Sequence, residues 1–379
     1  MKKLVLQLRN IVFFLYALPF VIFWNRRKPI PHPQKILIVQ FAKLGDMVCT
    51  TPVFHAIKKK FPQAKVFVVG DSINEKILAG NPDVDKYIVA SEKNMFATAQ
   101  HLRKEHFDFA CTMGPTFVAL LLLIFSGAKT IATYKISGGK ANQTRTYKIL
   151  QHFTIPIPYA FGEYLSRTHL RLLEPIGIFS EDTKKHLYIT SEAQTSVEKL
   201  FTSHGVDKKD FIVGISSSAG GRNKEWPPQR FAEISNYLSK RYNATIVLIG
   251  GPNDQGVVSV MLAYLEPSVK FLNTAGMLTI EELKAIVSRI NLFISVDTGP
   301  IYIAEAFDVP TIDILGPLDI NEQAPRGPLH RAIVPKNMKK VLRFAMNVRN
   351  HDIDDVRKEV ESITVEMVKE VIDELIARI

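Results

Sequence analysis

The sequence contains little cysteine. Only Cys49 and Cys111 occur among 379 residues, and they lie far apart in the chain. A chain of this size without a cysteine framework is typical of a reducing compartment, which argues against a disulfide-stabilised secreted protein. Neither cysteine has neighbours at the spacing of metal ligands, so we expect both to fill the hydrophobic core.

The sequence also lacks an apolar run long enough to span a membrane. The uncharged run from Ile11 to Trp24 is shorter than the ~20 residues that a spanning helix needs. It is followed by Arg26, Arg27 and Lys28, whereas a secretory signal would end in a small-residue cleavage site. Basic residues on both sides favour a segment that lies in the cytoplasmic leaflet, so we expect residues 1–34 to associate with a membrane. A spanning helix and a buried core helix are the alternatives.

Acidic residues are scarce in two segments that carry most of the positive charge. The net charge of the chain is +11. Residues 1–35 contain seven basic residues and no acid (+7), and residues 127–175 contain seven basic and two acidic residues (+5). Two local basic surfaces indicate an anionic surface or substrate as the partner. We expect no nucleic-acid partner, because neither segment resembles a nucleic-acid-binding motif.

Alternating strand and helix patterns predict an α/β fold with two doubly wound domains in tandem. After a proline-rich spacer, residues 35–40 have the pattern of a buried parallel strand and open a series of alternating strands and helices. The pattern weakens near Glu174, and a second series opens at Phe211. We expect one domain over residues 35–185, a second over residues 190–345, and a C-terminal helix within residues 350–379 that packs on the body of the protein.

One junction has the features of a phosphate-binding turn. An apolar run of strand length leads into Asp297, Thr298, Gly299 and Pro300, after which a helical pattern starts. Pro300 suits the first position of that helix, whose unpaired N–H groups and positive end would face an anion at the turn. An ordinary strand-to-helix connection is the alternative.

Three further loops are expected at the carboxyl ends of strands, where open parallel sheets bind their ligands. The first carries Asp46 at the start of a helix, where a carboxylate is either an N-terminal cap or a general base. The second combines the stretch Ser216–Gly221 with Lys224, which suits a phosphate. The third, Gly250–Asp254, is either a tight turn or a wall beside a nucleoside.

Five ordered blocks of the sequence closely resemble glycosyltransferase family 9, the heptosyltransferase-like enzymes of lipopolysaccharide core assembly. The blocks are Ile36-Leu37-Ile38-Val39 with Leu44-Gly45-Asp46 and Thr51-Pro52; Lys224 with Trp226-Pro227; Gly250-Gly251-Pro252; Ala275-Gly276 with Leu283; and Asp297-Thr298-Gly299-Pro300, followed by Leu315-Gly316-Pro317. The resemblance covers roughly residues 35–345, and five ordered blocks are far more specific than any one of them.

The resemblance implies a GT-B architecture, in which two Rossmann-like domains face a cleft and bind the acceptor and a nucleotide sugar respectively. It implies that Asp46 is the catalytic base, that Lys224 contacts the donor's phosphates, and that Asp297, Thr298 and Gly299 form the diphosphate turn. The implied reaction is an inverting, metal-independent transfer without a cofactor. The sugar would be a heptose from ADP-heptose, and the acceptor a lipopolysaccharide core or related glycolipid at the cytoplasmic face of the inner membrane.

The resemblance also suggests further contacts and shows two departures from the family pattern. Candidate donor contacts include Ser217, Ser218, Asn253 and Tyr302, and candidate acceptor contacts are Lys43, Lys140 and Arg145. Tyr302 stands where the family usually has histidine, and Gln40 stands where it commonly has arginine or lysine.

Two other classes of enzyme fit the sequence less well than a family 9 glycosyltransferase. An NAD-dependent oxidoreductase needs a glycine fingerprint after the first strand, but residues 41–46 contain a single glycine. A metal-dependent transferase would use an Asp-x-Asp loop, which Asp83-Val84-Asp85 and Asp352-Ile353-Asp354 match in sequence alone. We expect His55, His101, His106 and His169 to be structural or surface residues. Two alternatives stay open: a family member with another nucleotide sugar and glycan acceptor, and a non-catalytic two-domain solute-binding protein.

Overall fold

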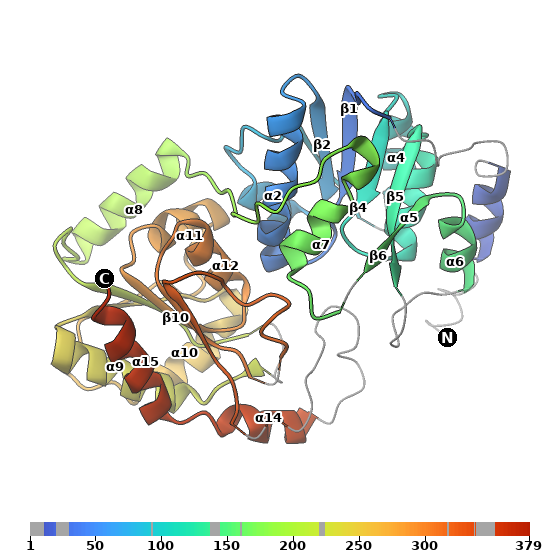
Figure 1. Ribbon diagram of the computed structural model, residues 1–379. Coiled ribbons are helices and arrows are strands. Elements are labelled where there is room, and N and C mark those ends of the chain that lie inside the picture. Colours follow the sequence, from blue (N-terminus) through green and yellow to red (C-terminus); the bar gives the residue numbers. More distant parts are fainter. Residues whose placement is uncertain are drawn as a thin grey trace. The chain divides into compact units, whose positions relative to one another are not determined.

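The computed structural model describes residues 11–19, 30–91, 94–136, 145–159, 161–219, 224–316, 318–336, 338 and 353–379 (Figure 1). The candidate acceptor residue Lys140 and the loop residues Gly220 and Gly221 lie outside these ranges. The chain divides into two compact units, Met1–Lys185 and His186–Ile379. Each unit contains a six-stranded parallel sheet, which confirms the predicted α/β class with two such sheets.

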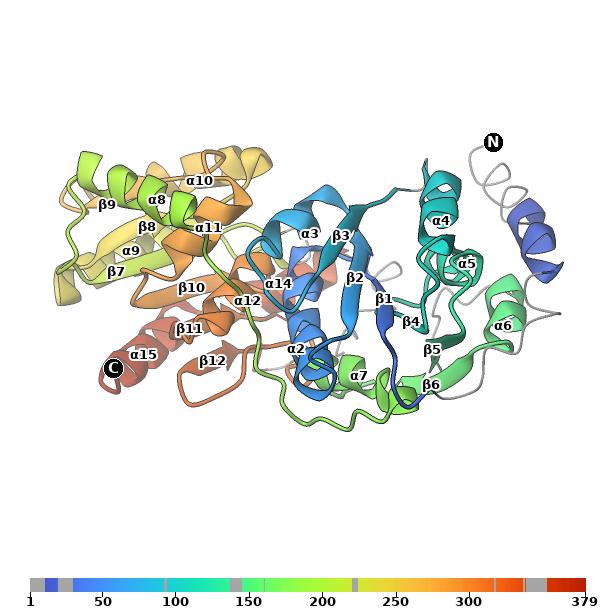
Figure 2. The same cartoon turned by 90° about the horizontal axis from the view of Figure 1, so that it is seen from above.

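Unit 1, residues 1–185, has the strand order β3-β2-β1-β4-β5-β6. Its strands are β1 (Lys35–Val39), β2 (Lys65–Gly70), β3 (Lys86–Val89), β4 (Phe109–Thr112), β5 (Thr130–Ile136) and β6 (Ile155–Tyr159). Its helices include α2 (Leu44–Lys60), α3 (Ser72–Ile77), α4 (Met95–Arg103), α5 (Phe117–Phe125), α6 (Arg145–Gln151), α7 (Leu165–Arg171) and the short η1 (Glu174–Ile176). Helices α2 and α3 cover one face of the sheet and α4 and α5 the other (Figure 2).

Unit 2, residues 186–379, has the strand order β12-β11-β10-β7-β8-β9. Its strands are β7 (Ile212–Ser216), β8 (Thr245–Leu248), β9 (Phe271–Asn273), β10 (Leu292–Val296), β11 (Thr311–Ile314) and β12 (His330–Ile333). Its helices include α8 (Ser191–Ser203), α9 (Pro228–Tyr242), η3 (Pro252–Asp254), α10 (Gln255–Leu262), α11 (Ile280–Val287), α12 (Gly299–Ala306), α14 (Ile353–Glu361) and α15 (Val365–Ile376).

Each sheet has a switch point, where the chain connections diverge to the two sides. In unit 1 the switch point lies between β1 and β4, and in unit 2 it lies between β7 and β10. Divergent connections leave room above the carboxyl ends of the two central strands, which is where open α/β sheets bind ligands. The loop that leads to Asp46 follows β1, and the turn that starts at Asp297 follows β10.

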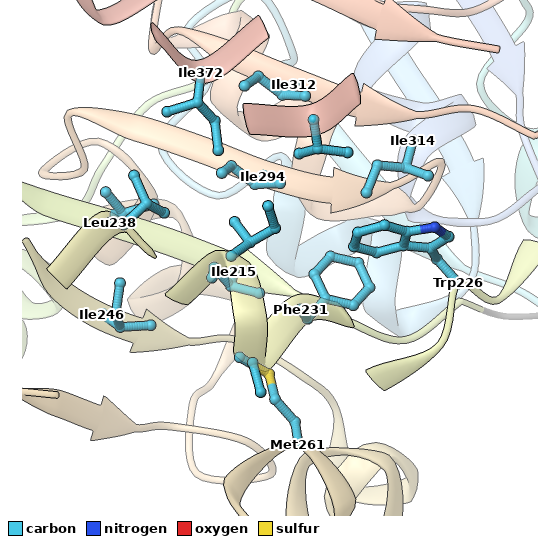
Figure 3. Close-up of a cluster of buried hydrophobic side chains, with 14 of the residues drawn as sticks. Ile215, Trp226, Phe231, Leu238, Ile246, Met261, Ile294, Ile312, Ile314 and Ile372 are labelled. Carbon is cyan, nitrogen blue, oxygen red and sulfur yellow. The ribbon is translucent and has the colours of Figure 1, made fainter. Parts of the chain in front are cut away.

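The core of unit 2 lies between the sheet and helices α9, α10 and α15 (Figure 3). Ile215, Ile294 and Ile312 come from three adjacent strands and meet Phe231 of α9 and Ile372 of α15. Because side chains alternate along a strand, the residues between these isoleucines point to the other face of the sheet. That alternation directs Ser295 of β10 and Asp313 of β11 to the other face of the sheet, where α12 contacts both strands.

The described part of the N-terminal segment is a short helix over residues 11–19. Ala17 is fully buried in the hydrophobic cluster that contains α4 and α5, and Phe13, Phe14 and Leu18 pack against this cluster. Within the described ranges, no helix combines the length and apolar character needed to cross a membrane.

Candidate functional site

The candidate residues of unit 1 lie where β1 ends and α2 starts. Lys43 occupies the N-cap position of α2, its side chain makes no capping hydrogen bond, and Asp46 is the third residue of the helix. The alternative in which Asp46 is itself the N-cap residue is therefore wrong. A half-buried carboxylate in the first turn is favoured by the positive end of the helix dipole, which places an anionic group at the switch point of unit 1.

A buried polar chain holds the turn that carries Asp46. The Gln40 amide donates to Thr50 Oγ1 over 3.1 Å, and Thr50 Oγ1 donates to the Asp46 carbonyl oxygen over 2.8 Å. The same hydroxyl lies 3.3 Å from Nδ1 of His169 on α7. Burial lowers the pKa of His169 to about 3, so the imidazole is neutral. Gln40 and His169 thus fix the position of the Asp46 backbone through Thr50.

Helix α2 contains a proline, and neighbouring hydroxyls satisfy the carbonyls around it. Pro52 has no N–H to donate to the Val48 carbonyl, and the Thr51 hydroxyl donates to that oxygen over 2.8 Å. Ser166 of α7 donates to the next carbonyl, that of Cys49, over 2.9 Å. Helix α7 therefore contacts the first half of α2 through Ser166 and His169. The sequence pattern showed the proline but did not predict these two contacts, because Ser166 and His169 lie more than 100 residues further along the chain.

The candidate residues of unit 2 are organised around Asp297, at the end of β10. One carboxylate oxygen of Asp297 accepts a hydrogen bond from the Lys224 ammonium and the other accepts one from the Tyr302 hydroxyl. The side chains of Lys224 and Asp297 are 11% and 4% exposed, so this ion pair is largely shielded from water. Lys224 follows β7 and Asp297 follows β10, so their contact links the two loops at the switch point of unit 2.

The contacts of Asp297 change the role that its carboxylate can have. Both oxygens already have donors, and an anionic side chain would repel a phosphate in any case. Asp297 therefore anchors the turn, while Lys224 and the main chain remain the groups suited to hold an anion.

Helix α12 begins at Gly299, so Pro300 is its second residue and not its first. Thr298 is the N-cap and its side chain makes no capping bond. Pro300 has no N–H and the Ile301 N–H donates to the Thr298 carbonyl oxygen over 3.1 Å, so Gly299 is the residue of this first turn whose N–H is suited to an anion.

A buried acid that the sequence analysis did not single out lies below this turn. Asp313 of β11 is fully buried, and neither of its carboxyl oxygens has a hydrogen-bond partner among the described residues. Burial raises the pKa of Asp313 well above its ordinary value, and the nearby charges of Asp297 and Glu305 raise it further, while Lys224 opposes them. These causes favour the protonated form of Asp313. The signal in the sequence was one acid inside the otherwise apolar run Ile312–Ile314.

The remaining candidate donor and acceptor contacts follow strands, as expected, but they differ in their exposure to water. Ser217 and Ser218 are buried directly after β7, and Asn253 is exposed in η3, after the neighbouring strand β8. The Gly276 N–H donates to the Gly250 carbonyl oxygen over 2.9 Å, which joins the loops after β8 and β9. In unit 1, Lys43 and Arg145 are exposed and follow β1 and β5, two strands with β4 between them.

The Asp-x-Asp stretch in unit 1 has a structural role. The Asp83 carboxylate lies 3.1 Å from His55 Nδ1, and Asp85 pairs with Lys58 and Lys65 at 2.6 and 2.9 Å. Burial opposes ionisation of Asp85, but hydrogen bonds from Lys58, the Val66 N–H and Lys65 outweigh it and lower the pKa of Asp85. Within the described ranges, no group of three or more histidine, cysteine or acidic residues could hold a metal ion. Asp352 lies outside those ranges.

The Asp313 environment predicts how stability changes with pH. The folded protein keeps a proton on Asp313 at pH values where the unfolded chain, with a pKa near 3.8, has lost it. Asp313 therefore destabilises the fold progressively as pH rises above 3.8. Asp313→Asn cannot titrate, so the free energy of unfolding of this variant relative to the unaltered protein should increase as the pH rises above 3.8, by at most about 1.4 kcal/mol per pH unit, until Asp313 ionises in the folded protein. Parallel pH curves for the two proteins would contradict a raised pKa.

Comparisons with known proteins identify the family of this chain. The profile of glycosyltransferase family 9 (heptosyltransferase) matches residues 95–350. Lipopolysaccharide heptosyltransferase 3 of Escherichia coli is 27% identical over 73% of this chain and 81% of its own length. Lipopolysaccharide core heptosyltransferase OpsX of Haemophilus influenzae is 21% identical over 74% of this chain and 79% of its own length.

Solved structures share the fold at low identity. A family 9 glycosyltransferase from Veillonella parvula superimposes with a TM-score of 0.76 at 20% identity, covering 91% of this chain and 98% of that one. The E. coli ADP-heptose lipopolysaccharide heptosyltransferase II gives a TM-score of 0.72 at 17% identity, covering 91% and 99%. The family match spans more than half of the chain and contains the four sequence blocks that follow residue 95. This chain therefore belongs to glycosyltransferase family 9 and is a glycosyltransferase.

Proposed function

We propose that this protein transfers a heptose from ADP-heptose, with inversion and without a metal, onto a lipopolysaccharide core acceptor. Several relatives are named lipopolysaccharide heptosyltransferases, and the E. coli heptosyltransferase WaaC, which shares the fold, is described with ADP and with a fluorinated ADP-heptose. The observation that carries the proposal is the pair of switch points, one with Asp46 and the other with Lys224 and Asp297. A family member that uses another nucleotide sugar is the alternative.

In this proposal unit 1 binds the acceptor and unit 2 binds the donor, as in other GT-B enzymes. The diphosphate lies against the turn at Thr298 and Gly299, where the backbone donors and the positive end of α12 favour negative charge. The Lys224 ammonium has three N–H donors, so it can contact a phosphate oxygen while it keeps Asp297. Tyr302 continues to satisfy the other oxygen of Asp297 and so preserves the turn.

The proposed reaction assigns a task to each of these groups. The Asp46 carboxylate takes the proton of the acceptor hydroxyl as that oxygen forms a bond to the anomeric carbon of the sugar. On the opposite side of this carbon the bond to the diphosphate breaks, and its electron pair moves onto the phosphate oxygen. Lys224 and the backbone donors stabilise the negative charge that develops there. Attack opposite the leaving group inverts the configuration of the sugar.

Replacement of Asp46 tests the base. Asp46→Asn should lower kcat by about 10²–10⁴-fold, because the amide cannot accept the proton. The donor dissociation constant and the melting temperature should hardly change, because a general base acts on the acceptor and asparagine keeps the shape of the side chain. Single-turnover kinetics with saturating donor would separate the two effects. Unchanged turnover would exclude Asp46 as the base, and a large loss of stability would point to a structural role.

The polar chain behind Asp46 gives a second test with a matched control. Thr50→Val removes the hydroxyl that links the Asp46 backbone to Gln40 and His169, and we expect kcat to fall by roughly 10–100-fold with an unchanged KM for the donor. Thr51→Val removes a similarly buried hydroxyl that donates to Val48. If Thr50 positions the base, Thr51→Val should lower stability without this loss of kcat, and Thr50→Ser should restore turnover. Equal losses in both valine variants would argue against positioning.

The donor half is tested by ligand-induced thermal shifts. ADP-heptose and ADP should raise the melting temperature, whereas UDP and GDP sugars should not, because only a ligand that binds the folded state stabilises it.

Lys224→Met should weaken the binding of ADP-heptose by roughly 10–100-fold and leave the binding of adenosine, which has no phosphates, unaffected. The single variant leaves the buried Asp297 carboxylate without its cation, and the double variant Lys224→Met, Asp297→Asn controls for this effect. Equal weakening of ADP-heptose and adenosine would place Lys224 away from the diphosphate, and loss of turnover in excess chelator would refute metal independence.

A further inference from the structure

The helix over residues 11–19 is fixed to unit 1 by aromatic contacts. The Phe13 ring packs edge-on against Phe96 of α4 at 4.8 Å, and the Tyr16 ring packs against Phe125 of α5 at 5.5 Å between centroids. Ala17 is fully buried in the same hydrophobic cluster. These contacts show that the inner face of the helix belongs to the core of unit 1. Of the alternatives that the sequence left open, these contacts agree with the buried core helix for this inner face.

The outer face of this helix is apolar and exposed. Ile11, Val12, Leu15 and Tyr16 are between 49% and 61% exposed, and their spacing of one, three and four residues places them along one side of a helix. Phe96 of α4, at 42% exposure, continues the patch. A contiguous patch of large apolar side chains is uncommon on a monomeric protein unless it binds a partner.

Helix α6 adds positive charge beside this patch. The two helices lie side by side in both views, and Tyr147 and Leu150 of α6 share the hydrophobic cluster with Ala17 (Figures 1 and 2). The outer side of α6 exposes Arg145, Lys148 and Ile149. We name the exposed side chains of residues 11–16, Phe96, Lys148 and Ile149 the docking surface. It brings together residues from both of the basic segments of the sequence.

We propose that the docking surface binds a membrane that contains anionic lipids. Val12 and Leu15 would enter the boundary between headgroups and acyl chains, and Lys148 would meet lipid phosphates. Residues 1–35 carry seven basic residues and no acid, so their charge complements such a membrane. The same charge would repel a second copy of the chain, and an apolar ridge does not suit a nucleic acid. The membrane contact lies on unit 1, which is the acceptor unit in the proposed function, but membrane binding itself does not depend on the transfer chemistry.

Point variants of the full chain test this surface better than a truncation, because removal of residues 11–19 would uncover the rings of Phe96 and Phe125. The test variant is Val12→Ser, Leu15→Ser. The matched control is Val260→Ser, which alters an apolar side chain at 41% exposure on α10 in unit 2. A third variant, Lys148→Glu, reverses a charge of the docking surface.

Sedimentation with vesicles is the direct measurement. The unaltered chain and Val260→Ser should bind vesicles of phosphatidylcholine with phosphatidylglycerol and bind pure phosphatidylcholine weakly. Val12→Ser, Leu15→Ser should weaken binding to the anionic vesicles by at least about tenfold, and Lys148→Glu should weaken it at low salt but less at high salt. Anionic-vesicle binding by the double serine variant that equals that of the unaltered chain would overturn the proposal. Equal binding of the unaltered chain to both vesicle types would refute the requirement for anionic lipid.

Two further measurements separate this inference from its alternatives. Self-association of the unaltered chain in sedimentation velocity that disappears in the double serine variant would show that a second copy covers the surface, and would overturn the proposal. Transfer to a delipidated, water-soluble acceptor should be the same for all four proteins. If no protein transfers sugar but vesicle binding follows the expected order, the proposed function fails and the docking surface stands.

Discussion

The buried contact between Lys224 and Asp297 is the interaction on which the arrangement of the donor half depends. The two residues follow neighbouring strands whose connections diverge, so their contact holds the two loops at the point where the fold opens. The attraction between two shielded charges is largely offset by the loss of their hydration, so the pair contributes little net stability. Removal of one partner, however, would leave an uncompensated buried charge. The contact therefore determines the shape of the site more than the stability of the fold.

The electrostatic balance around this contact explains how the turn can accept more negative charge. Lys224 neutralises Asp297, Tyr302 supplies a neutral donor, and the environment of Asp313 favours its protonated form. A second ionised acid below the turn would oppose a diphosphate and would compete for Lys224. Because burial keeps Asp313 neutral, the ammonium of Lys224 and the dipole of α12 remain available to an anion. Tyr302, in the position where the family pattern has histidine, anchors Asp297 without adding a charge of its own.

The sequence predicted the places of the functional groups better than their contacts. Loops after β1, β7 and β10 were expected at the carboxyl ends of strands, and Asp46 lies there in unit 1 and Lys224 and Asp297 in unit 2. The sequence did not predict that the Asp297 carboxylate accepts a hydrogen bond from Lys224, because the two residues are 73 positions apart and no local pattern links them. His169 was expected to be a structural or surface residue, and it is buried. That its ring supports the turn of Asp46 depends on a tertiary contact that spacing along the chain does not reveal.

The two sides of the sheet in unit 1 have different tasks under the proposed docking. Helix α2, with Asp46, covers one face, while α4 and α5 cover the other and hold the helix over residues 11–19 (Figure 2). Since aromatic rings join that helix to the core, membrane binding would hold the whole unit in one orientation. The glycolipid acceptor of the proposed function would be confined to the same membrane, so its encounter with the unit would become a search in two dimensions at a raised effective concentration. Under that proposal a fixed orientation would also limit which acceptor hydroxyls reach Asp46, and acceptors would be selected by distance from the membrane.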